Sequence, residues 1–278
     1  MSLQPVPHWA RRGTPRAHGQ IVFWEGASLW LLGTRPGEAP FPKTQPHAHH
    51  AVQITLALRG SITLESSGQQ VSGLAAAVAP DMEHSFEAGE GVIVHLFVDP
   101  EGRIGRALQS ALFSSSKLVA LPTSRFAELP AQLLAHFEAS EAAGPALLAL
   151  GRELLARLVS DTARDERPEA RVRKMSAWAA ERLGQPVSLA DAAAHVGLSN
   201  GRARHLFVES TGLPFRTYLL WLRLTKAVEL FSAGASLTEA AQHAGFSDSA
   251  HLSRTFRRMF GIAADSLRLS KRLGPVSE

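Results

Sequence analysis

The chain contains one stretch of sequence twice, and this internal repeat restricts its fold more than any other feature. Residues 188–199 read SLADAAAHVGLS and residues 236–247 read SLTEAAQHAGFS, at an offset of 48 residues. Each copy is followed by a run that ends in Phe and then Gly, Phe207 with Gly212 and Phe256 with Gly261, at an offset of 49. A repeat of this kind indicates one supersecondary unit used twice.

Each copy carries the sequence signals of two short helices around a turn. In the second copy Glu239 follows Ser236 by three residues, which is the capping-box pattern. Gly245 breaks this helix, and a second helix is expected over roughly 249–260, with Gly261 at its end. The pattern is that of a helix-turn-helix, whose second helix enters the major groove of DNA.

The segments around the two copies also favour helices. We expect a first helix over 172–183, a long connecting helix over 215–232 and a short last helix near 264–272. At 1.5 Å per residue the connector would span about 27 Å. This is near the roughly 34 Å between successive major grooves on one face of DNA, so both reading helices could face one side of the duplex.

Charge is unevenly distributed along the 278 residues. Residues 1–167 carry 14 Lys and Arg against 16 Asp and Glu, whereas residues 168–278 carry 15 against 9. A basic C-terminal third beside a nearly neutral remainder indicates a polyanionic partner for that third.

Residues 20–100 have the pattern of short strands separated by Gly, Pro and Ser, which is typical of a β-sandwich or barrel. Hairpin turns are expected at Arg59-Gly60 and at Ser67-Gly68-Gln69. The strands are expected at 21–24, 28–32, 52–58, 61–65 and 92–98.

This β-region contains the histidine cluster His47-Ala-His49-His50 and resembles a cupin, a small jelly-roll barrel. The first cupin motif is matched by His47, His49 and Gly60, with Gln53 where an acid usually stands, and the second by Gly73, Pro80 and His84. His47 and His49 point to one side of a strand. With His84 they could hold a divalent metal through three nitrogens.

Two other interpretations of these side chains stay open. His47, His49, Gln53 and His84 could line a pocket for an organic effector, or the histidines could be purely structural. His50 is expected to point away from His49, and His95 is expected to be a hydrogen-bonded core residue.

From 103 to 164 the apolar period becomes helical, and Gly144-Pro145 separates two of the runs. The apolar stripes could pair two copies of the chain or pack on the β-domain. The charged segment 161–169, which contains Pro168, is the expected interdomain linker.

Several classes of protein are excluded by what the sequence lacks. It has no cysteine, which fits a reducing compartment. We find no apolar core of a signal peptide near the N-terminus, and no apolar run of the roughly 20 residues that span a bilayer. A cytoplasmic protein without membrane contact is expected.

The whole chain resembles the AraC/XylS family of bacterial transcription regulators. Two positions depart from the family pattern, Ala264 in place of a usual Pro and Leu267 in place of a common aromatic. The resemblance rests on Gly197-Leu198-Ser199, Phe207, Gly212, Tyr218, Arg223-Leu224, Ala227, Ala240-Ala241, Gly245-Phe246-Ser247, Phe256 and Gly261.

The resemblance implies an α+β multidomain protein in three parts. Residues 1–105 would form the cupin-like effector domain, 106–167 linker and dimerisation helices, and 168–278 the all-α double helix-turn-helix domain. Base contacts would come from Arg204, His205, Ser249, His251, Ser253 and Arg254, and phosphate contacts from Asn200, Arg202, Arg257 and Arg258.

The expected function is a sequence-specific regulator, activator or repressor, controlled by a small molecule or metal in the cupin. Its partners would be a double-stranded DNA operator, a second copy in a homodimer and, for an activator, RNA polymerase. One alternative is a regulator whose ligand-free cupin serves only dimerisation. A metal-dependent cupin enzyme is the other, but the missing acid and the DNA-binding module argue that the chain is no enzyme.

Overall fold

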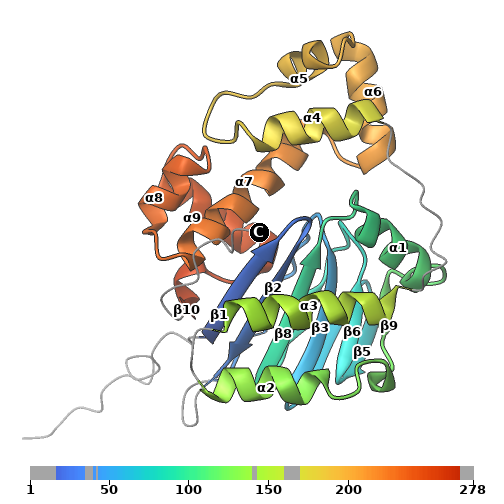
Figure 1. The fold of residues 1–278 in the computed structure, drawn as a ribbon, viewed down its shortest axis with the longest axis vertical. Coiled ribbons are helices and arrows are strands. Elements are labelled where there is room, and N and C mark those ends of the chain that lie inside the picture. Colours follow the sequence, from blue (N-terminus) through green and yellow to red (C-terminus); the bar gives the residue numbers. More distant parts are fainter. Residues whose placement is uncertain (1–16, 35–39, 42, 140–142, 160–169, 270–278) are drawn as a thin grey trace, which may run out of the picture.

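The computed structural model describes residues 17–34, 40–41, 43–139, 143–159 and 170–269, and the expected linker lies outside these ranges. A β-rich part up to residue 159 is followed by a mainly helical part from Ala170 onward, as Figure 1 shows. The α+β architecture expected from the sequence is therefore confirmed.

Within the described residues the strands form two sheets. The larger has the order β10-β1-β2-β8-β3-β6-β9 and the smaller β5-β4-β7. They are jelly-roll-like but do not close into one barrel. The bounds are β1 Ala17–Trp24, β2 Ala27–Gly33, β3 Val52–Arg59, β4 Ile62–Ser66, β5 Gln69–Gly73, β6 Ala75–Val78, β7 Ser85–Glu87, β8 Val92–Val98, β9 Leu118–Ala120 and β10 Leu267–Leu269.

The two faces of the larger sheet bury different partners, because successive side chains alternate across a strand. Leu29 and Leu31 of β2 belong to the core beneath the helices, whereas Trp30 and Leu32 belong to the core on the other face. The first face is covered by α1 (Arg103–Leu112), α2 (Leu129–Ala139) and α3 (Gly144–Leu158); α2 and α3 lie in front of it in Figure 1. The short turn η2 (Thr123–Arg125) precedes α2.

One of the two expected hairpins is present. Ser67-Gly68 joins β4 to β5, with Ser66 paired to Gln69. The hairpin expected at Arg59-Gly60 is wrong, because β3 pairs with β6 and β8 while β4 pairs with β5 and β7. Gly60, at φ +84°, is where the chain passes from one sheet to the other.

The helical part contains α4 (Ala170–Ala180), α5 (Leu189–His195), α6 (Asn200–Thr211), α7 (Phe215–Ser232), α8 (Leu237–His243) and α9 (Ser249–Phe260). The bounds of α7 are those expected from the sequence, and the two helix pairs are confirmed. None of the helices in the described part of the chain is long and apolar enough to cross a membrane.

The expected short helix over 264–272 is wrong. Residues 264–266 form a single 3-10 turn, η3, and Leu267–Leu269 become β10. This strand pairs in parallel with β1, Ala17 opposite Leu267 and Gly19 opposite Leu269. The backbone groups along that edge of β1 offer hydrogen bonds that a local helix signal does not reveal.

Candidate DNA-reading helices and a pocket between the two parts

The repeat folds into two similarly capped helix-turn-helix units. Ser188 accepts a hydrogen bond from the Asp191 amide at the start of α5, and Ser236 does the same for Glu239 at the start of α8. In the second unit the Glu239 carboxylate also accepts from the Ser236 amide at 2.8 Å, which completes the capping box. Each unit therefore begins at the serine that the sequence indicates.

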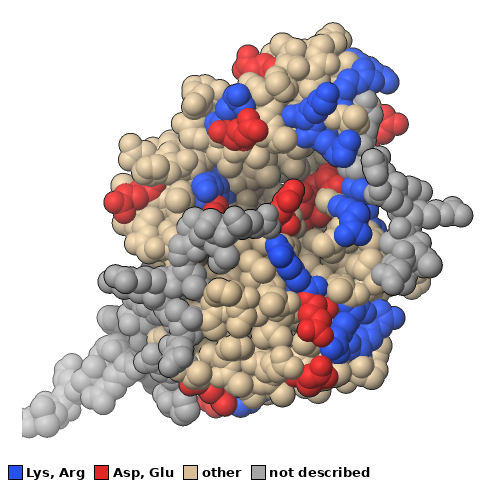
Figure 2. Space-filling model, viewed as in Figure 1, with Lys and Arg blue, Asp and Glu red and all other residues tan. Residues whose placement is uncertain are grey.

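The second helix of each unit buries one face and exposes the other. On α6, Ala203, Leu206 and Phe207 are buried, while Arg204 and His205 are exposed. On α9, Leu252, Phe256 and Met259 are buried, and Arg254 is exposed. The expected phosphate-contacting side chains are exposed too: Asn200, Arg202, Arg257 and Arg258. Figure 2 shows Lys and Arg gathered over the upper part of the molecule, where Figure 1 places α4 and α6.

Three of the expected base-contacting residues on α9 are only partly exposed. The Ser253 hydroxyl donates to the Ser249 carbonyl oxygen at 2.8 Å, which occupies its proton within the helix. His251 Nδ1 lies 3.2 Å from the Ser247 hydroxyl, and its ring packs edge-on against Phe246. Arg254 is thus the most accessible of the expected base-contacting side chains on this helix.

The fold brings the three expected cupin histidines together. One ring nitrogen each of His47, His49 and His84 lies within 4.8 Å of the others, and all three side chains are buried. His47 and His84 face each other across an isolated β-bridge. Burial lowers the pKa of all three, to about 4 for His84, where the nearby His47 adds to the effect. Neutral imidazoles at this spacing are competent metal ligands.

Gln53 lies where the cupin pattern usually has an acid and joins the cluster through its amide oxygen. Gln53 Oε1 is 2.8 Å from His49 Nε2 and 3.2 Å from His84 Nε2. His84 Nδ1 lies 2.8 Å from the Met82 carbonyl oxygen, so a neutral His84 carries its proton there. Its Nε2 then presents a lone pair to the Gln53 oxygen, and His49 Nδ1 is buried without a hydrogen-bond partner. A cation bound by His84 Nε2 and the Gln53 oxygen would relieve the contact between these two lone pairs.

His50 points away from His49, as expected, and joins two acids that the sequence did not single out. Its Nδ1 lies 2.8 Å from Asp81 Oδ2 and its Nε2 2.8 Å from Glu101 Oε1. Burial alone would lower the pKa of His50, but the two carboxylates raise it to about 9. His95 is also held as expected, with Nδ1 2.9 Å from the Thr55 hydroxyl.

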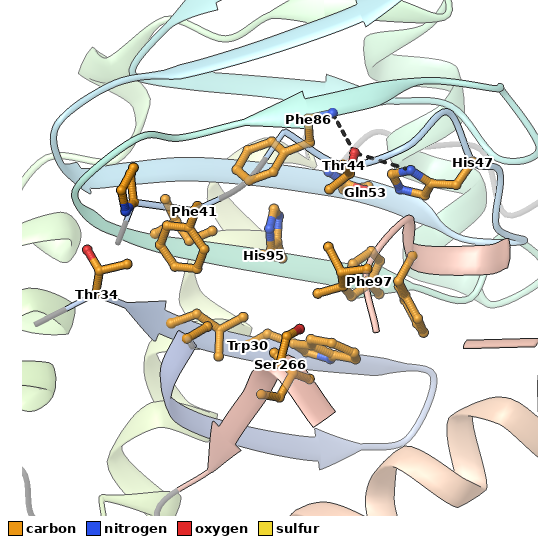
Figure 3. A pocket seen from close by; sticks show the side chains of 17 residues that line it. Trp30, Thr34, Phe41, Thr44, His47, Gln53, Phe86, His95, Phe97 and Ser266 are labelled. Carbon is orange, nitrogen blue, oxygen red and sulfur yellow. Dashed lines mark hydrogen bonds between the residues drawn. The ribbon is translucent and has the colours of Figure 1, made fainter. Parts of the chain in front are cut away.

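A cavity opens beside the histidines, and both parts of the chain line it. Figure 3 shows His47 and Gln53 on one side and Trp30 and Ser266 on the other. The lining is mainly apolar, and its volume is about 60 Å³. Four of the lining residues come from the end of α9 and the segment after it: Phe260, Ile262, Ser266 and Leu267. Sequence analysis missed these four because nothing local relates them to the β-domain.

The segment after α9 is fixed tightly against the histidine loop. The Gln45 amide donates to the Gly261 carbonyl oxygen at 3.1 Å. Gly261 has φ +69°, and a Cβ at this position would lie 2.6 Å from His47 Nδ1 and 2.5 Å from the Gln45 carbonyl oxygen. Only glycine fits here, so the residue that ends the second reading helix also contacts an expected ligand-binding histidine.

Comparisons with known proteins agree with these observations. Residues 192–270 match a family model described as a helix-turn-helix domain. The HTH-type transcriptional activator RhaS of Escherichia fergusonii is 35% identical over 105 residues, which cover 37% of this chain and 38% of that protein. RhaS of Klebsiella pneumoniae is 33% identical over 101 residues. The chain thus matches less than two fifths of the length of these curated relatives, which are named regulators rather than enzymes.

The whole fold has solved counterparts. ToxT from Vibrio cholerae matches with a TM-score of 0.54 at 12% identity, over 87% of this chain and 96% of that one. A ToxT structure with a bound unsaturated fatty acid matches with a TM-score of 0.52, also at 12% identity, over 86% of this chain and 93% of that one. At this identity the likeness concerns the fold.

Proposed function

Since the chain is a member of the AraC/XylS family, we propose that it is a sequence-specific transcription regulator whose DNA binding responds to a small effector. The observation that carries this proposal is the pair of helix-turn-helix units, which bury equivalent faces and expose Arg204 on α6 and Arg254 on α9. The connector α7 holds 18 residues, a length that would set both helices on one side of a duplex.

Within this proposal the two arginines read bases and the flanking residues set the register. Arg204 and Arg254 would each bond O6 and N7 of a guanine, with His205, Ser249, His251 and Ser253 as further base contacts. Asn200, Arg202, Arg257 and Arg258 would bind phosphates. The exposure of the four phosphate-contacting side chains and of both arginines supports these roles.

The test is selection of binding sites from a random duplex library with the full-length chain. We expect enrichment of one site with two half-sites about one helical turn apart. Arg254→Ala should weaken binding to that site by ~1–3 kcal/mol and relax one base position. The matched variant Arg257→Ala should weaken binding to all sequences alike and reduce the salt dependence. An equal loss on random DNA in the Arg254→Ala variant would contradict base reading.

We place the effector in the cavity beside the histidines. Its volume of about 60 Å³ is well below the ~150 Å³ of a cavity that admits benzene. An organic effector therefore requires lining side chains to move, and movement of Phe260 or Leu267 would couple binding to the position of the second reading unit. The fatty acid named for the ToxT structure supports an organic, apolar effector class.

A divalent metal is the second candidate, favoured by the donor set of His47, His49, His84 and the Gln53 oxygen. Bound there, a metal would neutralise the facing lone pairs and fix the histidine loop. Metal content of protein purified without chelator tests this. Near-stoichiometric metal that disappears in His47→Ala/His49→Ala would support the site, and absence of metal from both proteins would exclude it.

The proposed partners are operator DNA, the effector, RNA polymerase if the protein activates, and a second copy in a homodimer, in the cytoplasm of a bacterium. The three-part division at residues 105 and 167 also stays a proposal. The apolar stripe of α3, Leu147, Leu150 and Leu154, is buried on the sheet, so a dimer would need another surface. Ligand-independent operator binding would favour a ligand-free cupin instead.

A further inference from the structure

A second cavity lies between the β1–β2 hairpin and α7, on the other side of a wall that contains Trp30, Phe97 and Phe260. Trp30 and Phe97 of this wall are labelled in Figure 3. The second cavity has a volume of about 210 Å³, which exceeds the ~150 Å³ that admits benzene. It therefore has room for a small organic molecule without any movement of the segment after α9.

Aromatic rings dominate the lining of this cavity. Trp24 and Trp30 come from the hairpin, Tyr218 and Trp221 from α7 and Phe260 from α9. Several of the rings fix one another: the centroids of Trp30 and Phe260 are 4.9 Å apart, and those of Trp221 and Phe260 are 6.2 Å apart. The faces of such rings carry negative potential and attract cations.

One carboxyl group completes the lining. Among the described residues around the cavity, Asp99 is the only one with an Asp, Glu, Lys, Arg or His side chain. No ion pair of the described residues includes Asp99, whose Oδ1 accepts a hydrogen bond from the Glu101 amide at 3.0 Å and whose carboxyl group also shares a side-chain hydrogen bond with Glu101. Burial, followed by the neighbouring Glu101, raises the pKa of Asp99 to about 7, although His50 acts in the opposite direction, so its surroundings stabilise the ionised carboxylate poorly.

Charged groups of both signs lie beside Asp99, outside the cavity lining. His50 lies between the carboxylates of Asp81 and Glu101. Arg106 donates to the Glu101 carbonyl oxygen, so these groups and Asp99 together comprise three carboxyls, one imidazolium and one guanidinium. The aromatic cavity is therefore lined by one carboxyl group and, among the described residues, by no cationic side chain, a combination suited to an organic cation and unfavourable for an anion.

We propose that this cavity binds a small organic ammonium ion, with Asp99 as its counter-charge and the tryptophan rings as its walls. The site is distinct from the histidine cavity, whose lining contains no carboxylate or basic side chain apart from His47 and His95 among the described residues. Through Tyr218 and Trp221 the bound cation contacts α7, which connects the two reading units. The proposal does not depend on the DNA-binding function.

Choline is the probe, and 3,3-dimethyl-1-butanol, its uncharged isostere, is the matched control ligand. Binding to the full-length chain is measured by titration calorimetry and by tryptophan fluorescence. We expect choline to bind at least tenfold more tightly than the alcohol. Asp99→Asn should reduce choline affinity at least tenfold and leave the alcohol unchanged, while Glu65→Gln, a carboxylate outside the cavity, should change neither.

Trp24→Leu gives a second readout, because it keeps an apolar side chain and removes one aromatic side chain. It should weaken the binding of choline more than the binding of the alcohol. Equal affinities for the two probes, no binding of choline, or an unchanged affinity in Asp99→Asn would each overturn the proposal. Site selection from the DNA library with Asp99→Asn should match the wild type, so failure of the cation site and failure of the DNA-binding function are separately visible.

Discussion

Among the described residues, Asp99 is the carboxyl group whose pKa the fold raises most clearly. In the unfolded chain its pKa is near 3.8, and burial raises it to about 7 in the folded protein. Between these values the folded state holds a proton that the unfolded state has released. The free energy of unfolding therefore falls, through this group, as pH rises from 4 to 7.

Asp99→Asn removes the free-energy cost of ionising a buried carboxyl group and keeps the shape of the side chain. We expect the variant to be more stable than wild type at pH 8 by roughly 1–3 kcal/mol, with the difference vanishing near pH 4. Urea denaturation at pH 4, 6 and 8 measures it, with Glu65→Gln as the control. A stability difference independent of pH would show that Asp99 ionises normally in the folded protein.

Several single residues could be placed from the sequence, and others could not. His47, His49 and His84 match a spacing pattern, so their convergence was predictable, as was the outward direction of His50. Asp99 and Glu101 lie in a turn after β8 that carries no such pattern. Their roles depend on Tyr218 and His50, which reach them only in the folded chain.

The serine that begins α8 is the element-scale feature with the clearest energetic consequence. The Ser236 hydroxyl accepts from the Glu239 amide, and the Glu239 carboxylate returns a bond to the Ser236 amide. In the first unit Ser188 makes the first of these bonds, but the cap there is not a full capping box. The shorter Asp191 side chain accepts a hydrogen bond from the serine hydroxyl, as Glu239 also does in the second unit.

Ser236→Ala should therefore cost about 1 kcal/mol of stability. Because the backbone amide of Ser236 keeps its Glu239 partner, the loss should not grow beyond the usual range for a cap. Glu239→Ala, measured beside it by urea denaturation, should lower the free energy of unfolding further when combined with Ser236→Ala. Additive losses no larger than those of exposed surface substitutions would argue against a structural role for the box.

Elements governed by local signals were predictable, and those governed by distant pairing were not. The helices α6, α7 and α9 follow from caps, apolar period and terminal glycines. The hairpin expected at Arg59-Gly60 failed because a glycine turn does not reveal which sheet the next strand joins. Leu267–Leu269 form a strand because they pair with β1. This partner lies some 250 residues earlier in the chain, so no local signal reveals the pairing.

At the scale of the molecule, the second reading unit is attached to the β-domain at its C-terminal end. β10 extends the larger sheet, Phe260 packs on Trp30 with centroids 4.9 Å apart, and Leu267 is 1% exposed. In the first unit the buried apolar residues of α6, Ala203, Leu206 and Phe207, belong to its own helical core. One end of the repeat is therefore held by the sheet that lines the effector cavity.

Leu267→Asp places a charge at this attachment and should release β10 while leaving the helices intact, because burying an unpaired carboxylate is unfavourable. Amide exchange in β1 at 17–19 should then accelerate at least tenfold, since this edge loses its ladder, and α6 should stay protected. Leu74→Asp is the matched control, as Leu74 is 49% exposed.

An organic effector that displaces the segment after α9 should accelerate exchange of the same β1 amides in the wild type. If amide protection of β1 stays unchanged in Leu267→Asp, β10 does not help to hold the second reading unit on the sheet. The coupling between the effector cavity and the second reading unit would then have to run through α7.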